Sequence, residues 1–252
     1  MPEISLIDML KAGVHFGHQQ SRRHPKMDQF IFTTRGGVSI INLEKTKTSL
    51  NQAADFVREL VARGGSIMFV GTKKQAREIV RAAAQKAAMP YVVDRWIGGL
   101  LTNYQHCRSL IQKLHQLKAD RASGELEKYT KKEQLEFAEE IERLEMLVGG
   151  VASMERLPEA MFVIDVKNEK TPVAEAKIVG MPVVAICDTN VNPADIKYPI
   201  PANDDATKSI QLICDTLIAA IEEGRKQHDA HLVQAARQAA ADLEAMNAQA
   251  QQ

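Results

Sequence analysis

The sequence predicts an α/β fold, in which a doubly wound parallel sheet carries helices on both faces and an inserted helical hairpin. Short, nearly continuous β-branched runs, typical of strands buried on both faces, alternate with amphipathic helical patterns. Strand–helix–strand repetition of this kind gives right-handed crossovers and a parallel sheet. Only residues 104–148 break the alternation, because they hold helical patterns and no strand signal.

A local sequence signal predicts each strand and helix of the sheet domain. The six expected strands are residues 38–42, 66–71, 91–93, 161–165, 183–187 and 198–200. The four expected helices have recognisable ends. The first helix covers residues 44–63 and stops at Gly64-Gly65, and the second begins at a Thr72–Gln75 capping box. The third has Thr171 as its cap, Pro172 at its first position and Gly180 at its end. The fourth follows Asn203-Asp204-Asp205 and runs to about residue 223.

Residues 104–148 predict an antiparallel coiled-coil hairpin, because two apolar seams are joined by a short link. Thr130 and Glu133 make a capping box at the second helix. The seams are Leu110, Leu114 and Leu117 on the first helix and Phe137, Ile141, Leu144 and Val148 on the second. We therefore expect an α/β domain formed by residues 1–103 and 149–226, an insertion at 104–148, and a mobile, Ala/Gln-rich tail at 227–252.

Composition limits the class of protein. The 252 residues are 45% hydrophobic and 25% charged, which is ordinary for a globular protein. No apolar run reaches the roughly 18 residues that span a membrane, and residues 1–13 lack a basic-then-apolar leader. The three cysteines show no CxxC spacing, so neither a disulfide framework nor a zinc knuckle is indicated. We expect a cytoplasmic protein.

The net charge of zero hides an asymmetry along the chain. Residues 1–132 carry a net charge of +11 and residues 133–252 a net charge of −11. Such a division points to one side that faces a polyanion.

The stretch SIMFVGTKKQAREIV, residues 66–80, has the layout of a phosphate-binding strand–turn–helix. It lacks the GxxxxGK[ST] of a P-loop and the GxGxxG of a dinucleotide fold. Lys73 and Lys74 would occupy the first turn of a helix, where the helix dipole disfavours cations unless an anion is near. Phosphate contact and ordinary solvation stay open for this pair.

His18, Asp188 and Asp205 form a candidate metal site. The two aspartates follow expected strands, and loops at the carboxyl ends of parallel strands converge. Imidazole and carboxylate suit zinc or another divalent ion. The alternative is local: Asp188 in an Asx-turn, and Asp204 and Asp205 at a helix start. No serine or cysteine nucleophile has an evident base, and no cofactor is required.

Other residues favour nucleic acid. The loop QQSRRHPKM concentrates cations suited to phosphate contacts, and DRWIGG places an arginine beside the single tryptophan, which suits base stacking or, equally, a core position. Lysines also mark the hairpin tip. With the turn lysines, the candidate RNA-binding residues are Arg22, Arg23, Lys26, Lys73, Lys74, Arg95, Trp96, Lys131 and Lys132.

Three functions compete on these features. The first is an RNA-binding structural protein, favoured by the basic half and the absence of a complete catalytic set. The second is an α/β enzyme acting on a nucleotide or sugar phosphate at the strand ends. The third is a protein-interaction module that uses the coiled coil and the acidic half, and whose binding would be insensitive to salt.

Seven motifs, in order, resemble a known family. They are LKAGVHFGHQ, FIFTTRGGVSIINLEKT, MFVGTKKQA, RWIGGLLTN, LPEAMFVIDVKNE, MPVVAICDTNVNP and YPIPANDDATKSI. Together they resemble the second protein of the small ribosomal subunit, in its bacterial form, from about residue 5 to residue 226.

The resemblance implies more than the residues alone predict. It implies a flavodoxin/Rossmann-like sheet with an inserted coiled-coil hairpin and no enzymatic activity. It implies binding to ribosomal RNA on the back of the small subunit, near the head–body junction, and docking of the largest small-subunit protein for messenger RNA capture. No membrane and no homo-oligomer are expected. Among the candidate residues, Arg22, Arg23 and Lys26 lie between the first two motifs and Lys131 and Lys132 lie in the hairpin. The other candidate RNA-binding residues and the possible metal ligands lie within the matched motifs.

Overall fold

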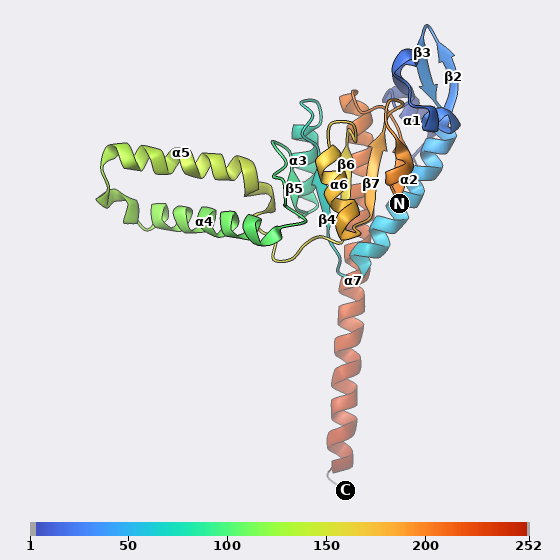
Figure 1. The fold of residues 1–252 in the computed structure, drawn as a ribbon. Coiled ribbons are helices and arrows are strands. Elements are labelled where there is room, and N and C mark those ends of the chain that lie inside the picture. Colours follow the sequence, from blue (N-terminus) through green and yellow to red (C-terminus); the bar gives the residue numbers. More distant parts are fainter. Residues whose placement is uncertain (1–3, 251–252) are drawn as a thin grey trace.

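The computed structural model of the protein describes residues 4–250, with side chains described for residues 4–234. A short helix, α1 (Leu6–Lys11), leads into a small antiparallel sheet, and a larger parallel sheet forms the centre of the molecule (Figure 1). No helix in the described part of the chain is long and apolar enough to cross a membrane.

The central sheet has five parallel strands in the spatial order β5-β4-β6-β7-β8. Counted along the chain within this sheet, the order is 2-1-3-4-5, which is that of flavodoxin-like folds. The strands are β4 (Ile67–Val70), β5 (Tyr91–Val92), β6 (Ala160–Ile164), β7 (Val183–Cys187) and β8 (Tyr198–Pro201). The prediction of a parallel α/β sheet is confirmed, and five of the six expected strands belong to it.

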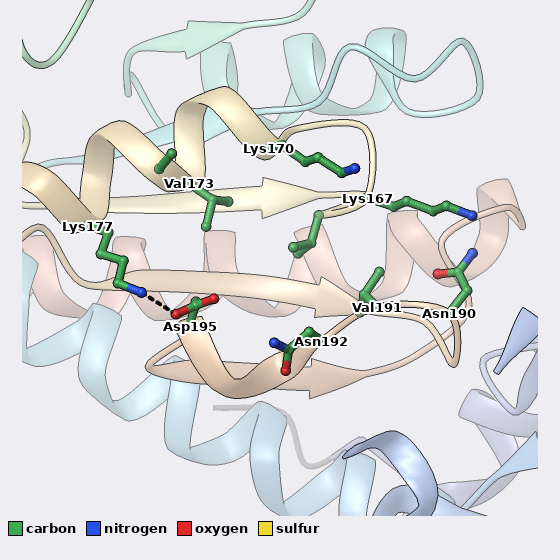
Figure 2. A pocket seen from close by; sticks show the side chains of 10 residues that line it. Lys167, Lys170, Val173, Lys177, Asn190, Val191, Asn192 and Asp195 are labelled. Carbon is green, nitrogen blue, oxygen red and sulfur yellow. Dashed lines mark hydrogen bonds and ion pairs between the residues drawn. The ribbon is translucent and has the colours of Figure 1, made fainter. Parts of the chain in front are cut away.

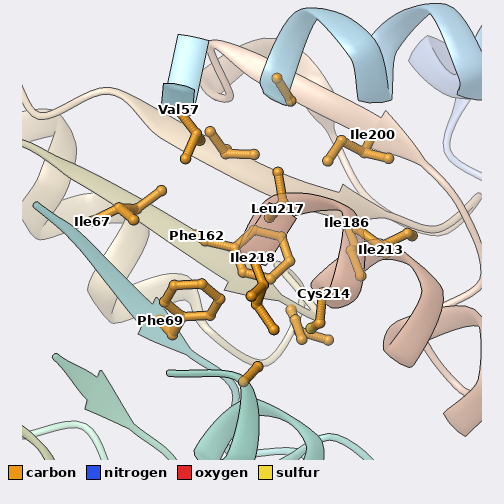
Figure 3. Packing of buried hydrophobic residues seen from close by; sticks show 14 of the residues in the cluster. Val57, Ile67, Phe69, Phe162, Ile186, Ile200, Ile213, Cys214, Leu217 and Ile218 are labelled. Atoms are coloured by element: carbon orange, nitrogen blue, oxygen red, sulfur yellow. The ribbon is translucent and has the colours of Figure 1, made fainter. Parts of the chain in front are cut away.

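Helices cover both faces of this sheet. Alternate residues of β4 point to opposite sides, so Phe69 packs toward α2 (Leu43–Ala62), α3 (Arg77–Lys86) and α7 (Thr207–Ala250), whereas Met68 packs toward α6 (Lys170–Val179). Figure 3 shows the first side, where Phe69 meets Phe162 edge to face at 5.4 Å between ring centroids, beneath the side chains of α7. Both faces of the central sheet are therefore buried under helices, as the β-branched sequences of its strands predict.

Residues 38–42 were expected in the parallel sheet, and that prediction is wrong. β3 (Val38–Ile41) is the middle strand of a separate antiparallel sheet, between β1 (Phe16–Gln19) and β2 (Ile31–Arg35). The reason lies in Gly36-Gly37, whose φ angles of +57° and +77° form a two-residue turn. Two consecutive residues with positive φ make the turn that joins adjacent antiparallel strands.

Two helix starts also differ from expectation. α3 begins at Arg77, five residues after Thr72, because the Thr72 amide and hydroxyl both donate to the buried Glu169 carboxylate and no capping box forms. α6 begins at Lys170 with Glu169 before it, so Thr171 lies inside the helix. The expected end of α6 is confirmed. Gly180 has φ +72°, a left-handed backbone conformation that glycine adopts without the steric strain that a side chain would cause.

The segment expected as an insertion holds two helices, α4 (Tyr104–Ala122) and α5 (Lys131–Val148), joined through the 3-10 helix η3 (Glu125–Lys128). They lie side by side and extend away from the sheet (Figure 1). Leu114, Ile141 and Leu144 are buried between them and the sheet domain, and the Thr130–Glu133 capping box is present. Supercoiling of the pair stays a prediction.

α7 continues without a break to Ala250, well past the expected end near residue 223. The tail segment is therefore helical as far as the structure describes it, and residues 251–252 lie outside the described part. Its mobility, and the division of the chain into domains, stay predictions.

Candidate functional site at the carboxyl edge of the sheet

Loops that follow the parallel strands bring one lysine and several acids together at the carboxyl edge of the sheet. Lys73 comes after β4, Asp165 after β6 and Asp188 after β7, while Asp204 and Asp205 lie between β8 and α7. This is the edge where open α/β sheets bind ligands.

Lys73 is the centre of this cluster. Its Nζ lies 2.7 Å from Asp204 Oδ1, 2.6 Å from Asp205 Oδ1 and 3.5 Å from Asp165 Oδ2, and its side chain is 13% exposed. Burial alone would lower the pKa of Lys73, but the hydrogen bonds to Asp204 and Asp205 outweigh it and hold that pKa above its usual value. A phosphate at Lys73 would have to compete with three carboxylates.

At Asp204, the pKa shifts in the direction that burial favours, in contrast to Lys73. Burial, followed by the nearby Asp188 carboxylate, raises the pKa of Asp204 to about 7, although Lys73 donates a hydrogen bond to it. Asn203 forms an Asx-turn just before α7, because its Oδ1 accepts from the backbone N–H groups of Asp205 and Ala206. The local alternative for Asp204 and Asp205, a place at a helix start, stays a prediction.

The three expected metal ligands do meet. His18 Nδ1 lies 3.0 Å from Asp188 Oδ1, and His18 Nε2 lies 3.6 Å from Asp205 Oδ2. The three donor atoms all fall within 4.8 Å of one another. His18 reaches this position from β1 because its backbone N–H donates to the Thr189 hydroxyl at 2.9 Å. The hydrogen bond to Asp188 raises the pKa of His18.

One imidazole nitrogen and two carboxylate oxygens are a donor set that zinc and other divalent ions accept. A tetrahedral zinc would take its fourth ligand from water or from a partner. The same atoms are also satisfied without an ion, since His18 bridges the two aspartates and Lys73 neutralises Asp205.

The N-terminal basic loop, residues 19–27, is fixed beside β7. The His24 backbone N–H donates to the Thr189 carbonyl at 2.8 Å. Arg22 and Lys26 are exposed and form no close ion pair within the described residues, although Lys26 lies near enough to Asp195 to interact with its charge. Arg23 pairs with Asp28 at 2.9 Å. Two of the three predicted cations of this loop are thus available to an outside anion.

Lys74 and Arg95 are also available to bind an outside anion. Both are exposed, and neither forms an ion pair within residues 4–234. Lys74 lies in the turn before α3 and not in the first turn of that helix, so the expected conflict with the helix dipole does not arise. β4 and β5 are neighbours, and the loops after them therefore present these two residues along one edge.

Trp96 belongs to the protein interior on one side. Its Nε1 donates to Glu175 Oε1 at 3.0 Å, and its ring packs against the buried cluster beneath α6. Trp96 therefore takes the core position that the sequence left open as an alternative. Base stacking by its remaining exposed edge stays a prediction.

Glu175 was missed by sequence reasoning. It is 6% exposed and accepts from the backbone N–H groups of Gly99, Leu101 and Thr102 as well as from Trp96. Burial alone would raise its pKa, but these hydrogen bonds hold the pKa of Glu175 below its usual value. The sequence signal that could have identified Glu175 is its position, a carboxylate on the apolar face of α6.

Lys131 and Lys132 do not join the cluster. They are exposed at the start of α5, at the end of the α4–α5 pair remote from the sheet (Figure 1). Lys132 lies 3.9 Å from Glu136, a weak exposed pair, and Lys131 has no acidic partner among the described residues.

Comparison with known proteins supports the resemblance. A family model described as "Ribosomal protein S2" matches residues 9–224. A "Small ribosomal subunit protein uS2" from Corynebacterium urealyticum is 46% identical over 258 residues, covering 99% of this chain and 96% of the relative. A protein of the same name from Dehalococcoides mccartyi is 45% identical over 225 residues, covering 89% and 92%.

The family match spans the parallel sheet, the basic loop, the acidic cluster and both helices of the inserted segment. Identity near 45% over almost the whole length of both chains goes with a shared fold and a shared role. The chain belongs to the ribosomal protein S2 family and is a structural, non-enzymatic protein of the small ribosomal subunit.

Proposed function

We propose that this protein binds small-subunit ribosomal RNA through the cations along the carboxyl edge of its sheet, on the back of the particle near the head–body junction. The position on the particle rests on the family resemblance. The residues proposed for RNA contact remain Arg22, Arg23, Lys26, Lys73, Lys74, Arg95, Trp96, Lys131 and Lys132.

One observation supports this proposal above the others. Arg22, Lys26, Lys74 and Arg95 are exposed and form no ion pair within residues 4–234, whereas Lys73 and His18 contact the aspartates of the same edge. Lys73 and His18 offset only part of the charge of those aspartates, so the exposed cations at the rim are the groups that attract a polyanion. Lys73 then acts chiefly as an anchor for the turn that presents Lys74, and Trp96 as an anchor beneath Arg95.

The test reverses two of these charges. Arg22→Glu with Lys26→Glu should reduce ribosomal RNA binding by at least about tenfold and flatten its salt dependence, because each lost phosphate contact removes released counterions. Filter binding at two salt concentrations and sedimentation of reconstituted small subunits measure this. Lys86→Glu with Lys226→Glu is the matched control, with two exposed lysines toward the opposite, amino edge of the sheet, one at the end of α3 and one far along α7. Equal binding by both variants would show that the loop assignment is wrong.

We further propose that His18, Asp188 and Asp205 hold zinc or another divalent ion where the largest small-subunit protein docks for messenger RNA capture. The converging donor atoms support this. His18→Ala with Asp205→Ala should abolish zinc binding by calorimetry and reduce retention of that neighbour, whereas His106→Ala with Asp120→Ala, on α4, should change neither. Full retention of the neighbour would leave the triad as an internal hydrogen-bonding group.

The remaining proposals follow from the same family. The protein works in the cytoplasm as part of the ribosome and not as a homo-oligomer, and α4 and α5 form a coiled-coil insertion whose tip lysines reach a phosphate. The competing interaction-module hypothesis predicts binding that does not weaken with salt, so the salt series distinguishes the two.

A further inference from the structure

A hollow of about 500 Å³ lies on the α6 side of the sheet, between the start of α6 and the loop that follows β7 (Figure 2). Its floor is apolar, formed by Val166, Val173 and Val191. Polar side chains stand around the floor, and none of the functions above uses them. The volume falls in the range of pockets that hold a small ligand.

The charges at the rim are unequal at its two ends. Lys177 Nζ lies 2.6 Å from Asp195 Oδ1, so this lysine is neutralised. Lys167 and Lys170 are exposed and have no acidic partner in the described part of the chain. Figure 2 shows the Lys177–Asp195 pair at one end of the hollow and Lys167 with Asn190 at the other. The open end therefore attracts an anion.

Asn190 adds a second requirement. Its Oδ1 is buried and has no hydrogen-bond partner. A buried acceptor left unpaired is destabilising, so an occupant that donates an N–H is favoured. Inorganic phosphate satisfies the lysines and can donate an O–H, but it leaves the apolar valine floor uncovered. A nucleotide has both groups, a phosphate for Lys167 and Lys170 and a base whose N–H can reach Asn190 while its ring covers the valines.

The hollow also continues the proposed RNA surface. The His24 backbone N–H is bonded to Thr189, the residue before Asn190, and Lys26 lines a shared groove with Pro193 beside the loop that contains Asp195. An RNA strand held at Arg22 and Lys26 thus passes directly beside the opening. Ribosomal RNA offers unpaired nucleotides whose bases can leave the stack and enter protein pockets.

We propose that this hollow receives one unpaired nucleotide of the ribosomal RNA, with Lys167 and Lys170 at its phosphate, the valine floor against its base and Asn190 accepting from the base edge. This rests on the proposed RNA-binding function and adds a position at which a single nucleotide is selected.

The test measures the affinity of the full-length protein for small-subunit ribosomal RNA together with a 2′-hydroxyl acylation footprint at single-nucleotide resolution. Lys167→Ala with Lys170→Ala should weaken binding about tenfold, and Asn190→Leu, which keeps the size but removes the acceptor, about fivefold. Both should expose the same unpaired nucleotide and leave other protections intact. Lys167→Arg with Lys170→Arg should bind like wild type, as should the control Lys86→Ala with Lys226→Ala.

The outcomes separate this inference from the function on which it rests. If the wild-type protein does not bind the RNA, the proposed function fails and this inference with it. If the wild-type protein binds and the hollow variants match the control in affinity and footprint, only this inference is wrong. If those variants keep RNA binding but lose a neighbouring protein from reconstituted subunits, the hollow takes an acidic peptide and the nucleotide proposal is overturned.

Discussion

Glu175 shows how one buried carboxylate can fix a whole loop. Because it is ionised and accepts from Trp96 and from three backbone N–H groups, it turns residues 96–102 inward and leaves Arg95 exposed. Sequence periodicity could not reveal this, since the donors lie more than 70 residues away along the chain. Such an acid can be identified only when its partners are placed in space.

Glu175→Gln should therefore reduce the free energy of unfolding by about 2 kcal/mol, because an amide NH₂ would face backbone donors that then stay unpaired. Urea unfolding followed by the fluorescence of Trp96, the only tryptophan, measures both the loss and the local change. Glu136→Gln, on the exposed face of α5, is the control and should be neutral. A neutral Glu175→Gln would mean that the loop is held by packing alone.

The pH dependence of Glu175 has a definite sign. Its folded-state pKa is depressed, so its contribution to stability is present above the unfolded-state pKa and is lost as pH falls through the folded-state value. The difference in unfolding free energy between wild type and Glu175→Gln should accordingly shrink on acidification.

His18 has the opposite sign. Its pKa is raised by Asp188, so protonated His18 stabilises the fold below its unfolded-state pKa, and that contribution disappears as pH rises through the folded-state pKa. With a chelator present, His18→Gln should lower the unfolding free energy more at about pH 5.5 than at about pH 8.5. A difference that stays the same at both pH values would contradict a charged His18–Asp188 pair.

At the scale of elements, α2 and α7 are in close backbone contact at Gly224. A Cβ built there would lie 2.5 Å from the Arg58 carbonyl oxygen, a backbone atom of α2 that cannot move alone. Gly224→Ala should destabilise by about 1–3 kcal/mol through this clash, which outweighs the roughly 1 kcal/mol that alanine gains in a helix. Thermal unfolding measures it. Gly98→Ala, where the added Cβ meets open space, should be neutral.

The element predictions succeeded and failed for identifiable reasons. Buried β-branched runs located β4, β6 and β7, because strands covered on both faces leave a continuous apolar record. The β2–β3 hairpin was missed, although its Arg35-Gly36-Gly37 turn was present in the sequence. Start sites of α3 and α6 depended on Glu169, whose bond to Thr72 spans 97 residues and leaves no local signal.

At the scale of the whole molecule, the convergence of His18, Asp188 and Asp205 followed from topology. Strand ends of a parallel sheet meet, and the sequence pattern was enough to identify the strands. Lys73 could not be assigned in the same way, because its partners Asp165 and Asp204 come from two other loops, after β6 and after β8, and neutralise it only in the assembled sheet. Charge counts along the chain record neither pairing nor burial.

Among the described side chains, the last contact of α7 with the body of the protein lies at His228. His228 Nδ1 lies 3.2 Å from the Ala62 carbonyl oxygen, whereas the side chains of residues 231–234 are all exposed. Truncation after Ala230 should change the unfolding free energy by less than about 0.5 kcal/mol. Truncation after Ile221, which also removes Gly224 and His228, should destabilise the fold clearly. Circular dichroism during urea titration distinguishes the two, and a large loss on the shorter deletion would mean that the tail packs on the body.

The long α7 helix has a steric consequence for assembly. At a rise of 1.5 Å per residue, residues 231–250 extend about 30 Å beyond the body, on the side away from the antiparallel sheet of β1, β2 and β3 (Figure 1). A rod of that length excludes neighbouring macromolecules from the space that it fills. We therefore expect partners to dock from the remaining directions, so that the tail limits the angle of their approach.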